Sequence, residues 1–553
     1  MNGLKSFILY GGFSLLILGC SASKKEKSDS DLILVSEINE TMLTGKFSPE
    51  WESLKQYETP EWFRDAKFGI WAHWGPQCVE GSGDWMARSM YQEGSGAYKH
   101  HVENYGHPSE FGFKDILPLF KAENWDPDSL VAFYKSVGAK YFMVLGNHHD
   151  NFDLWDSKYQ PWNSMNVGPK QDILAKWEAA SRKNGLPFGV SIHADHAPLW
   201  YEPSQRYDRN GDKMGVSYDG LLTAEDGKGL WWEGLDPQML YQQNHELSKG
   251  SWADGMIHQQ WEWGNGATLP SQEFVDNFYN RTMDMINRYN PDLIYFDATV
   301  LPLYPISDAG LKIAAHFYNK NIQDHDGNLE AVLFAKILND EQKQAMVWDV
   351  ERGAPNNIPE LPWQTCTCIG GWHYNSAIYE NNGYKSASQV VKLLADVVSK
   401  NGNLLLSVPL RSDGTFDEKE YAILLDLREW MNRNGEAIYG TRPWKIFGEG
   451  PIAEADIKIN AQGFNEGAYT KATAEEIRFT TKGEDLYAIA LDWPESGRLK
   501  IKNISSESFP ASKVELLGFG DVSFTQNPEG TEVTLPKEKV NSIAPVLKFS
   551  GGK

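Results

Sequence analysis

Residues 290–297 read Asn290-Pro291-Asp292-Leu293-Ile294-Tyr295-Phe296-Asp297 and combine a turn signal, a short apolar run and a final carboxylate. An apolar run that follows an Asn-Pro turn predicts a buried strand. A carboxylate just beyond such a strand is where an α/β barrel keeps its catalytic groups. The alternative is a purely structural role, in which the Asp caps the next helix. The remainder of the chain decides between these two roles for Asp297.

Apolar runs of the same kind recur along the chain and alternate with helix-like segments. The predicted strands lie at 67–75, 139–146, 187–193, 290–297, 331–334, 346–348, 365–369 and 403–408, with clear helices at 127–138, 172–184 and 273–289. This alternation predicts an α/β fold, a (β/α)8-like barrel with parallel strands. No glycine-rich phosphate-binding motif follows any of these strands, which disfavours nucleotide-binding α/β folds.

Polar side chains stand at the carboxyl ends of four of the predicted strands. They are His73, His148, His149, His193 and Asp297. Helix capping explains one such residue but not the whole series. Because the carboxyl ends of barrel strands converge on one face, we expect these side chains to meet in a single pocket.

The length and charge of the chain limit its organisation and its partners. A chain of 553 residues is too long for one ordinary core. Residues 450–548 contain short apolar runs separated by Gly, Asp and Pro turns, which predicts an antiparallel β-sandwich. We therefore expect a catalytic barrel over 47–445 and a sandwich over 446–553.

The net charge of −23 argues against nucleic acid and anionic membrane surfaces as partners.

A long insertion at about 195–272 shows no regular strand–helix alternation. It is rich in tryptophan: Trp200, Trp231, Trp232, Trp252, Trp261 and Trp263. Long loops in compact domains are usually functional, so we expect this one to wall the pocket. Its segment 208–219 resembles the start of a calcium loop, but Lys213 stands where an EF-hand needs Gly and Asp219 replaces the final Glu. A loop without calcium is the preferred interpretation.

The N-terminus is predicted to be a targeting segment. An apolar run at 7–18 is too short to span a bilayer and fits a signal-peptide core. It ends in Leu16-Ile17-Leu18-Gly19-Cys20, which resembles a bacterial lipobox, with cleavage before Cys20 and lipid attached to its thiol. We expect a signal peptide over 1–19, a tether over 20–46, and a lipid anchor as the only membrane contact. The mature protein would then lie in the bacterial cell envelope, either in the periplasm or on the outer surface.

Three further cysteines offer no metal site. Cys366 and Cys368 are too closely spaced for a usual zinc knuckle, and no second Cys/His pair accompanies them. An odd number of cysteines also leaves at least one free thiol. We interpret Cys78, Cys366 and Cys368 as small buried residues.

Several motifs together resemble glycoside hydrolase family 29, the α-L-fucosidases. They are Phe68-Gly69-Ile70-Trp71-Ala72-His73-Trp74-Gly75, His148-His149, Tyr295-Phe296-Asp297-Ala298, Pro362-Trp363-Gln364-Thr365-Cys366, Gly371-Trp372-His373-Tyr374-Asn375, Gly402-Asn403-Leu404-Leu405-Leu406 and Asn434-Gly435-Glu436-Ala437-Ile438-Tyr439-Gly440. They cover roughly residues 47–495 in the right order. The resemblance implies a barrel with a C-terminal β-sandwich that hydrolyses terminal α-L-fucosyl linkages of oligosaccharides or polysaccharides. It also implies retention of configuration and no metal or organic cofactor.

The resemblance also implies roles for individual residues. The nucleophile of the family falls on Asp297. The residues that hold the sugar fall on His73, Asp84, Trp85, His148 and His149, and Trp372 is a further candidate. Neutral imidazoles and indoles suit a sugar because they bind hydroxyls and pack on C–H faces without adding formal charge.

The acid/base is assigned to Glu351, in Trp348-Asp349-Val350-Glu351-Arg352-Gly353. It lies at the end of a predicted strand and twelve positions before Trp363, similar to the place of the family's acid/base. A retaining glycosidase needs such a second carboxyl group about 5–5.5 Å from the nucleophile. Asp349 and Glu262 are the competing candidates. The non-catalytic alternative for Glu351 is an ion pair with Arg352.

Three departures from the family pattern bear on the sugar. Tyr295 stands where the family has Trp, Asp84 stands where it has Glu, and the substrate-contacting Tyr of the third strand is missing. His193, aided by His196, could replace that Tyr. A more polar pocket would also suit α-L-galactose or a sulfated fucose of an algal polymer. A catalytically silent glycan-binding lipoprotein is the alternative from another functional class.

Overall fold

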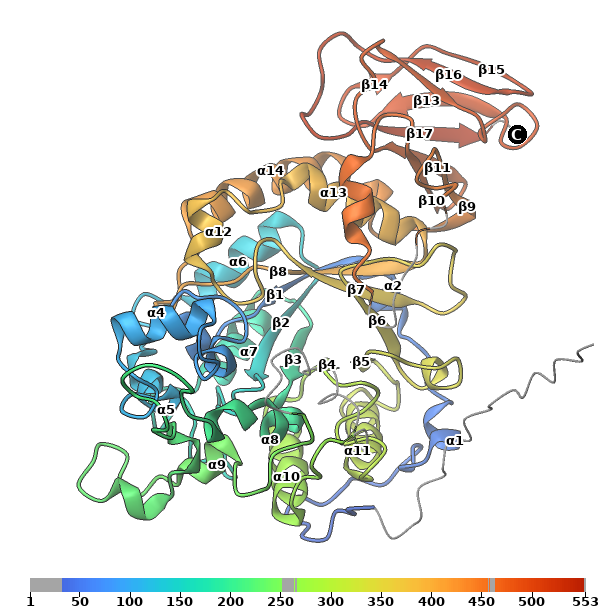
Figure 1. The fold of residues 1–553 in the computed structure, drawn as a ribbon. Helices are drawn as coiled ribbons and strands as arrows, with labels where there is room; N and C mark the ends of the chain where they lie inside the picture. The colour runs from blue at the N-terminus through green and yellow to red at the C-terminus, as the bar shows by residue number, and fades with distance from the viewer. Residues whose placement is uncertain (1–31, 251–262, 264–265, 456, 458–462, 552–553) are drawn as a thin grey trace, which may run out of the picture. The chain divides into compact units, whose positions relative to one another are not determined.

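Eight parallel strands form a closed barrel in this computed structural model, which describes residues 32–250, 263, 266–455, 457 and 463–551. Each strand pairs with the next, and β8 pairs with β1 (Figure 1). The strands are β1 (Phe68–Ala72), β2 (Tyr141–Asn147), β3 (Phe188–Ile192), β4 (Leu293–Phe296), β5 (Val332–Ala335), β6 (Val347–Glu351), β7 (Trp363–Cys368) and β8 (Gly402–Ser407). The predicted (β/α)8 barrel is therefore confirmed.

The barrel strands are apolar because both of their faces are covered. All residues of the strands are buried except two positions of β6, as expected for parallel strands between a packed interior and a layer of helices. Side chains that accept a backbone N–H start several of these helices: Asp126, Asp172, Ser271, Ser386 and Asp417. The longer helices of the barrel are α6 (Pro127–Val137), α7 (Ile173–Lys183), α10 (Gln272–Tyr289), α11 (Ala309–Asp324), α13 (Ala387–Ser399) and α14 (Glu418–Asn434).

Shorter helices precede the barrel or lie in its loops. Two short helices, α1 (Trp51–Leu54) and α2 (Glu61–Ala66), precede β1. The others are α3 (Met86–Ser89), α4 (Gly96–Asn104), α5 (Phe113–Ile116), α8 (Ala197–Trp200), α9 (Pro237–Tyr241) and α12 (Ser376–Glu380).

The C-terminal part consists of two antiparallel sheets with their own apolar core. The six-stranded sheet has the order β14-β13-β17-β11-β10-β9, and the three-stranded sheet has the order β12-β16-β15. The strands are β9 (Arg442–Glu449), β10 (Ile477–Lys482), β11 (Asp485–Ala490), β12 (Arg498–Ile501), β13 (Ala511–Leu516), β14 (Gly520–Asp521), β15 (Phe524–Asn527), β16 (Gly530–Thr534) and β17 (Val546–Gly551). The sheet begins at Arg442, four residues before the predicted boundary.

A buried ionic network joins this sheet to the barrel. Arg478 of β10 donates through Nε to Asp396 of α13 at 2.6 Å, and Lys400 donates to the same carboxylate at 2.7 Å. Glu476 lies 3.1 Å from Arg478 Nη1. Breaking such a pair leaves an uncompensated buried charge, so the network fixes how β10 lies on α13.

Residues 33–46, which we expected to belong to a tether, instead lie along α10 and α11. Ser36 donates to Asp276, the backbone of Asn39 donates to Asn280, and the backbone of Leu43 donates to His316. Val35 is buried. The local sequence pattern does not reveal this packing because the polar partners lie 240 to 273 positions away along the chain. The predicted signal peptide and Cys20 lie outside the described residues, and none of the described helices is both long and apolar enough to cross a bilayer.

Two carboxylates of segment 208–219 accept hydrogen bonds from tyrosine side chains. Asp208 accepts from the hydroxyls of Tyr98 and Tyr218, and Asp219 accepts from the hydroxyls of Tyr91 and Tyr241. These hydrogen bonds tie segment 208–219 to the segments that carry Tyr91, Tyr98 and Tyr241.

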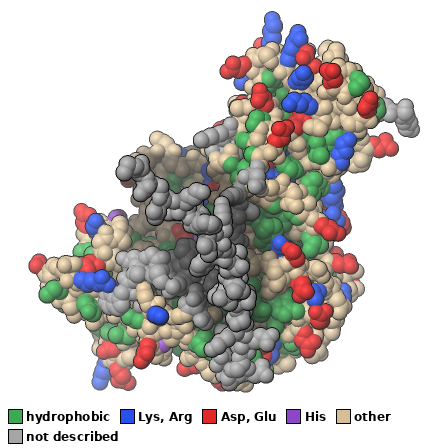
Figure 2. Space-filling view, turned by 45° about the vertical axis from the view of Figure 1, so that its right-hand side comes forward, with side chains coloured by type: hydrophobic (Ala, Val, Ile, Leu, Met, Phe, Trp, Pro, Cys, Tyr) green, Lys and Arg blue, Asp and Glu red, His purple; other side chains and the backbone are tan. Residues whose placement is uncertain are grey.

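On the face drawn in Figure 2, acidic and basic side chains are interspersed outside the grey atoms, without a broad basic area.

Candidate active site

A cavity of about 280 Å³ lies at the carboxyl ends of the barrel strands. Its described lining consists of Trp71, His73, Asp84, Trp85, His148, His193, Tyr295, Asp297, Ala298, Thr299, Lys336, Glu351, Cys366, Trp372 and Phe464. The polar strand ends predicted from the sequence therefore share one cavity, except His149, which lies directly behind its wall. Five strands, β1 to β5, end immediately before one of these polar side chains, and β6 ends in Glu351.

Asp297 is surrounded by hydrogen-bond donors. His149 Nε2 lies 3.2 Å and His193 Nδ1 lies 3.4 Å from Asp297 Oδ2, while Lys336 Nζ donates to Oδ1. Burial alone would raise the pKa of Asp297, but Lys336 and the two histidines hold this pKa well below its ordinary value. Asp297 is therefore an oriented, ionised carboxylate, the state that a nucleophile needs.

Lys336 links the two carboxylates of the proposed catalytic pair. Its Nζ donates to Asp297 Oδ1 and, at 2.6 Å, to Glu351 Oε2. Burial would lower the pKa of Lys336, but the charges of Asp297 and Glu351 hold it well above its ordinary value. Our sequence reasoning missed this residue. The signal was present, since Lys336 follows the apolar run of β5 just as Asp297 follows that of β4.

An ion pair with Arg352 would have given Glu351 a purely structural role, but the two side chains form no such pair. Arg352 Nε instead donates to Glu466 Oε1 at 2.7 Å. A shared ammonium requires Asp297 and Glu351 to lie close together. This arrangement fits the short carboxyl separation of retaining glycosidases, about 5–5.5 Å, better than the 6.5–9.5 Å of inverting ones.

Asp349 and Glu262 are the other candidates for the acid/base. Burial raises the pKa of Asp349 to about 6, a value that would suit an acid. Its oxygens, however, accept from Gln364 Nε2 at 2.9 Å, Cys366 Sγ at 3.0 Å and Tyr295 Oη at 3.1 Å, beneath the cavity floor. Asp349 therefore has no access to a sugar. Glu262 lies outside the described residues.

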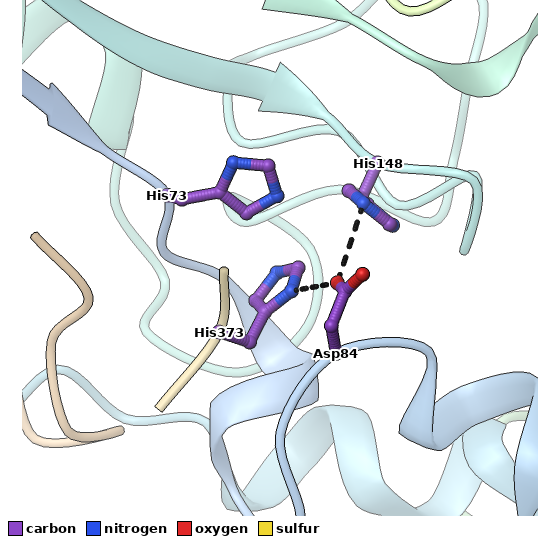
Figure 3. Close-up of side chains that lie close together, drawn as sticks. All are labelled: His73, Asp84, His148 and His373. Atoms are coloured by element: carbon purple, nitrogen blue, oxygen red, sulfur yellow. Dashed lines mark hydrogen bonds and ion pairs between the residues drawn. The ribbon is translucent and has the colours of Figure 1, made fainter. Parts of the chain in front are cut away.

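Histidines and Asp84 form a cluster on one side of the cavity (Figure 3). His373 Nδ1 lies 2.7 Å from Asp84 Oδ1, and His148 Nε2 lies 3.7 Å from the same oxygen. His73 contacts the rings of both histidines, and neither of its nitrogens has a hydrogen-bond partner among the described residues. The ligand atoms of the four side chains lie within 4.8 Å of one another, a spacing that also suits a metal ion.

Three histidines of the cavity wall, His73, His148 and His193, are neutral at physiological pH. Burial, followed by the neighbouring histidines, holds the pKa of His73 and of His148 well below the ordinary value. Burial lowers the pKa of His193 to about 4 despite the charge of Asp297. A neutral imidazole has one donor and one acceptor nitrogen, which matches the hydroxyl groups of a sugar.

Aromatic side chains form the apolar part of the wall. The ring of Trp372 lies 5.6 Å from that of His73, and the ring of Tyr295 lies 5.0 Å from that of Trp71. The tryptophan-rich insertion contributes none of its described residues to the wall, in contrast to our expectation. Trp200 instead lies behind the wall, with its ring 5.8 Å from His149. Trp252 and Trp261 lie outside the described residues.

The sequence matches the family described as alpha-L-fucosidase over residues 34–436. The chain belongs to the alpha-L-fucosidase family. Residues 470–550 also match the C-terminal domain of alpha-L-fucosidases. The resemblance seen in the sequence is thus confirmed, and with it the assignment to a family of glycoside hydrolases.

Known alpha-L-fucosidases are similar to this chain along nearly its whole length. The tissue alpha-L-fucosidase of Mus musculus is 27% identical over 500 residues, which cover 89% of this chain and 91% of the mouse protein. The Thermotoga maritima alpha-fucosidase in complex with fucose is 27% identical with a TM-score of 0.63, covering 91% of this chain and 100% of that chain. The complex of the same enzyme with a mechanism-based inhibitor has a TM-score of 0.65 and covers 91% and 99%.

A segment between β9 and β10 completes the active site of this fucosidase-family chain. Gly463 forms a β-bridge with Glu351, and the backbone of Phe464 donates to the Glu351 carbonyl at 2.8 Å. This contact places Phe464 in the cavity wall. The C-terminal part of the chain therefore supports the end of β6 from which Glu351 projects.

We predict that Gly463→Ala lowers kcat/KM on an aryl α-L-fucoside by about tenfold, because small displacements of catalytic groups are costly. Gly463 has a φ of +131°, and a Cβ there would come within 2.1 Å of the Glu351 carbonyl oxygen. Gly467→Ala is the matched control, since a Cβ at Gly467 would meet nothing within 4 Å. Equal activities of the two variants would contradict the role of this segment.

Proposed function

We propose that this chain is an exo-acting, retaining α-L-fucosidase that removes terminal α-L-fucosyl units from oligosaccharides or polysaccharides by double displacement. The observation that carries the proposal is the pair of carboxylates, Asp297 and Glu351, held by one buried ammonium at the mouth of a barrel. The family membership and the resemblance to a Thermotoga maritima enzyme solved with fucose support the sugar.

In the first step, Asp297 attacks the anomeric carbon, and the protonated carboxyl group of Glu351 donates its proton to the departing glycosidic oxygen. This step breaks the glycosidic bond and forms a covalent fucosyl-enzyme. In the second step, Glu351 takes a proton from water, which attacks the anomeric carbon and releases Asp297. Two inversions leave the fucose with its original α configuration. No cofactor enters either step.

The cavity suits one terminal sugar unit. Its volume of about 280 Å³ is slightly below the usual range of ligand pockets, roughly 300–1,000 Å³. The neutral His73, His148 and His193 offer hydrogen bonds to hydroxyls, and Trp85 and Trp372 offer apolar faces. Both buried nitrogens of His73 lack hydrogen-bond partners among the described residues and can bind hydroxyls of the sugar.

The decisive experiment uses aryl α-L-fucoside and aryl α-L-galactoside, with NMR detection of the first product anomer. We expect faster hydrolysis of the fucoside and initial release of the α anomer. Faster hydrolysis of the galactoside would show that the enzyme prefers α-L-galactosides. His193 would then be the extra hydrogen-bonding group that recognises this sugar. Glycan binding without hydrolysis of either compound would instead identify a silent binder.

Lys336→Gln is expected to move the acid limb of the kcat/KM profile to higher pH by at least about one unit. Asp297 must be ionised to attack, and loss of the Lys336 charge raises the pKa of Asp297, so activity disappears at a higher pH on acidification. We expect kcat/KM at the wild-type optimum to fall about 10- to 100-fold. The pH profile from 3 to 9 on an aryl fucoside measures both effects. Lys336→Arg, which keeps the charge, should retain the wild-type acid limb, and an unshifted limb in Lys336→Gln would contradict this role.

We further propose that the mature protein is anchored to the bacterial cell envelope through lipid on Cys20. The apolar run at 7–18, followed at once by Cys20 and a polar segment, supports this localisation. Labelling of cells with a radioactive or clickable fatty acid should mark the wild-type protein and not Cys20→Ser. A wild-type protein without label would exclude the anchor.

A further inference from the structure

A second cavity lies beside the active site, on the other side of Phe464. Its volume is about 460 Å³, and Phe464 lines both cavities. Arg352 and Glu466 line it near the end of β6, and Gly370 and Lys385 line it after β7. None of these four residues has a role in the two-carboxylate mechanism.

The second cavity lies next to the proposed acid/base. Arg352 follows the proposed acid/base directly in sequence, and the backbone of Glu466 donates to the Arg352 carbonyl at 2.9 Å. The acid must face the glycosidic oxygen, which belongs to the leaving group after cleavage. A sugar attached through that oxygen therefore extends past Glu351 and Phe464 toward this cavity.

Positive charge exceeds negative charge around the cavity. Glu466 Oε1 accepts from Arg352 Nε at 2.7 Å and from Lys385 Nζ at 3.1 Å, so one carboxylate lies between two cations. Glu466 Oε2 accepts from Thr367 at 2.7 Å. Neither Nη nitrogen of Arg352 has a hydrogen-bond partner among the described residues, and its side chain is 37% exposed. A planar guanidinium edge of this kind suits a sulfate or a carboxylate.

The backbone at the boundary of the two cavities is strained. Arg352 has a φ of +50° and Phe464 a φ of +60°, both in the left-handed region that bulky residues rarely adopt. Such strain persists only where neighbouring contacts enforce it, and it gathers at ligand-binding sites. Here the β-bridge between Glu351 and Gly463 holds both residues in place.

Aromatic and glycine residues give the cavity room for a sugar ring. The half-exposed ring of Phe464 and the ring of Tyr384 line it, and such rings pack on sugar C–H faces. A Cβ on Gly370 would come within 2.8 Å of the Tyr384 ring, so a larger residue there would displace the ring.

We propose that this cavity is a leaving-group subsite that binds an anionic sugar, carrying a sulfate ester or a uronic carboxylate, next to the fucosyl unit. The Nη edge of Arg352 and the ammonium of Lys385 receive the anion, and Phe464 packs on the sugar ring. This inference rests on the proposed fucosidase activity and adds the chemical class of the glycan that carries the fucose.

The test compares kcat/KM on four substrates: an aryl α-L-fucoside, a fucosyl-galactose disaccharide, the same disaccharide with a sulfated galactose, and a fucosyl-glucuronate. We expect the wild type to prefer at least one anionic disaccharide to the neutral one by about tenfold. Arg352→Gln should remove that preference while it leaves hydrolysis of the aryl fucoside within about twofold. The sulfated and uronic substrates distinguish the two sources of the anion.

Arg498→Gln is the matched control, because this arginine lies 65% exposed on β12 of the three-stranded sheet. It removes the same charge from the protein and should keep the preference. Equal rates on neutral and anionic disaccharides in the wild type, or a preference that survives in Arg352→Gln, would overturn the subsite. Absence of aryl fucoside hydrolysis by the wild type would overturn the proposed function instead, so the two failures are distinguishable.

Discussion

Asp297→Gly is expected to reduce kcat on an aryl α-L-fucoside by roughly four orders of magnitude or more, as removal of a catalytic nucleophile does in other hydrolases. Asp297 is the carboxylate that three donors orient in the cavity, from His149, His193 and Lys336. Without it, no covalent intermediate forms. The remaining donors and the acid/base cannot supply a second group that attacks the anomeric carbon.

Rescue by azide distinguishes a folded variant that lacks only the nucleophile from a variant that is inactive because it is unfolded. The space left by the Asp297 side chain admits a small anion, and Lys336 remains to attract it. Azide should therefore restore part of the turnover of Asp297→Gly and yield β-L-fucosyl azide, because it attacks once with inversion. Asp297→Asn is the control: its side chain fills the space, so azide should not restore activity. Normal turnover in Asp297→Gly, or rescue with an α product, would remove Asp297 from the role of nucleophile.

The sequence was sufficient for the barrel because the signals that define it are local. Most of the strands are apolar runs bounded by turns, and their faces are buried, so the pattern of β4 or β8 can be read without knowledge of its neighbours. The ends of strands in a barrel also converge by geometry alone. For this reason the sequence alone assigns His73, His148, His193 and Asp297 to one pocket.

The missed features depend on contacts between distant parts of the chain. Lys336 becomes significant only when β4, β5 and β6 are adjacent, which brings it between Asp297 and Glu351. Phe464 enters the cavity because a segment of the C-terminal part pairs with the end of β6. Residues 33–46 look like a polar linker until the side chains of α10 and α11 are placed beside them. In each case the sequence names the residue but not its partner, because the partners lie 15 to 273 positions away and nothing local encodes which residues will meet.

Glu351→Ala is expected to slow hydrolysis in proportion to how much the leaving group needs a proton. A general acid contributes about 10²–10⁴-fold. For a fucosyl disaccharide, whose leaving alcohol is weakly acidic, kcat/KM should fall by about three orders of magnitude. For a dinitrophenyl fucoside, which leaves as a stable anion, kcat/KM should change by no more than about tenfold, although the fucosyl-enzyme then accumulates because water lacks its base. A burst of dinitrophenol in stopped-flow measurements would reveal that intermediate.

Azide should again restore turnover, but the product must differ from that of Asp297→Gly. In Glu351→Ala the nucleophile is intact, so azide attacks the β-linked fucosyl-enzyme and yields α-L-fucosyl azide. Glu466→Gln removes a nearby carboxylate that pairs with Arg352, and should preserve the dependence of the wild type on the leaving group. Asp349→Asn tests the buried competitor. If Glu351→Ala lowers kcat/KM equally for the disaccharide and the dinitrophenyl fucoside, Glu351 is not the acid/base. If Asp349→Asn instead slows the disaccharide much more than the dinitrophenyl fucoside, Asp349 has that role.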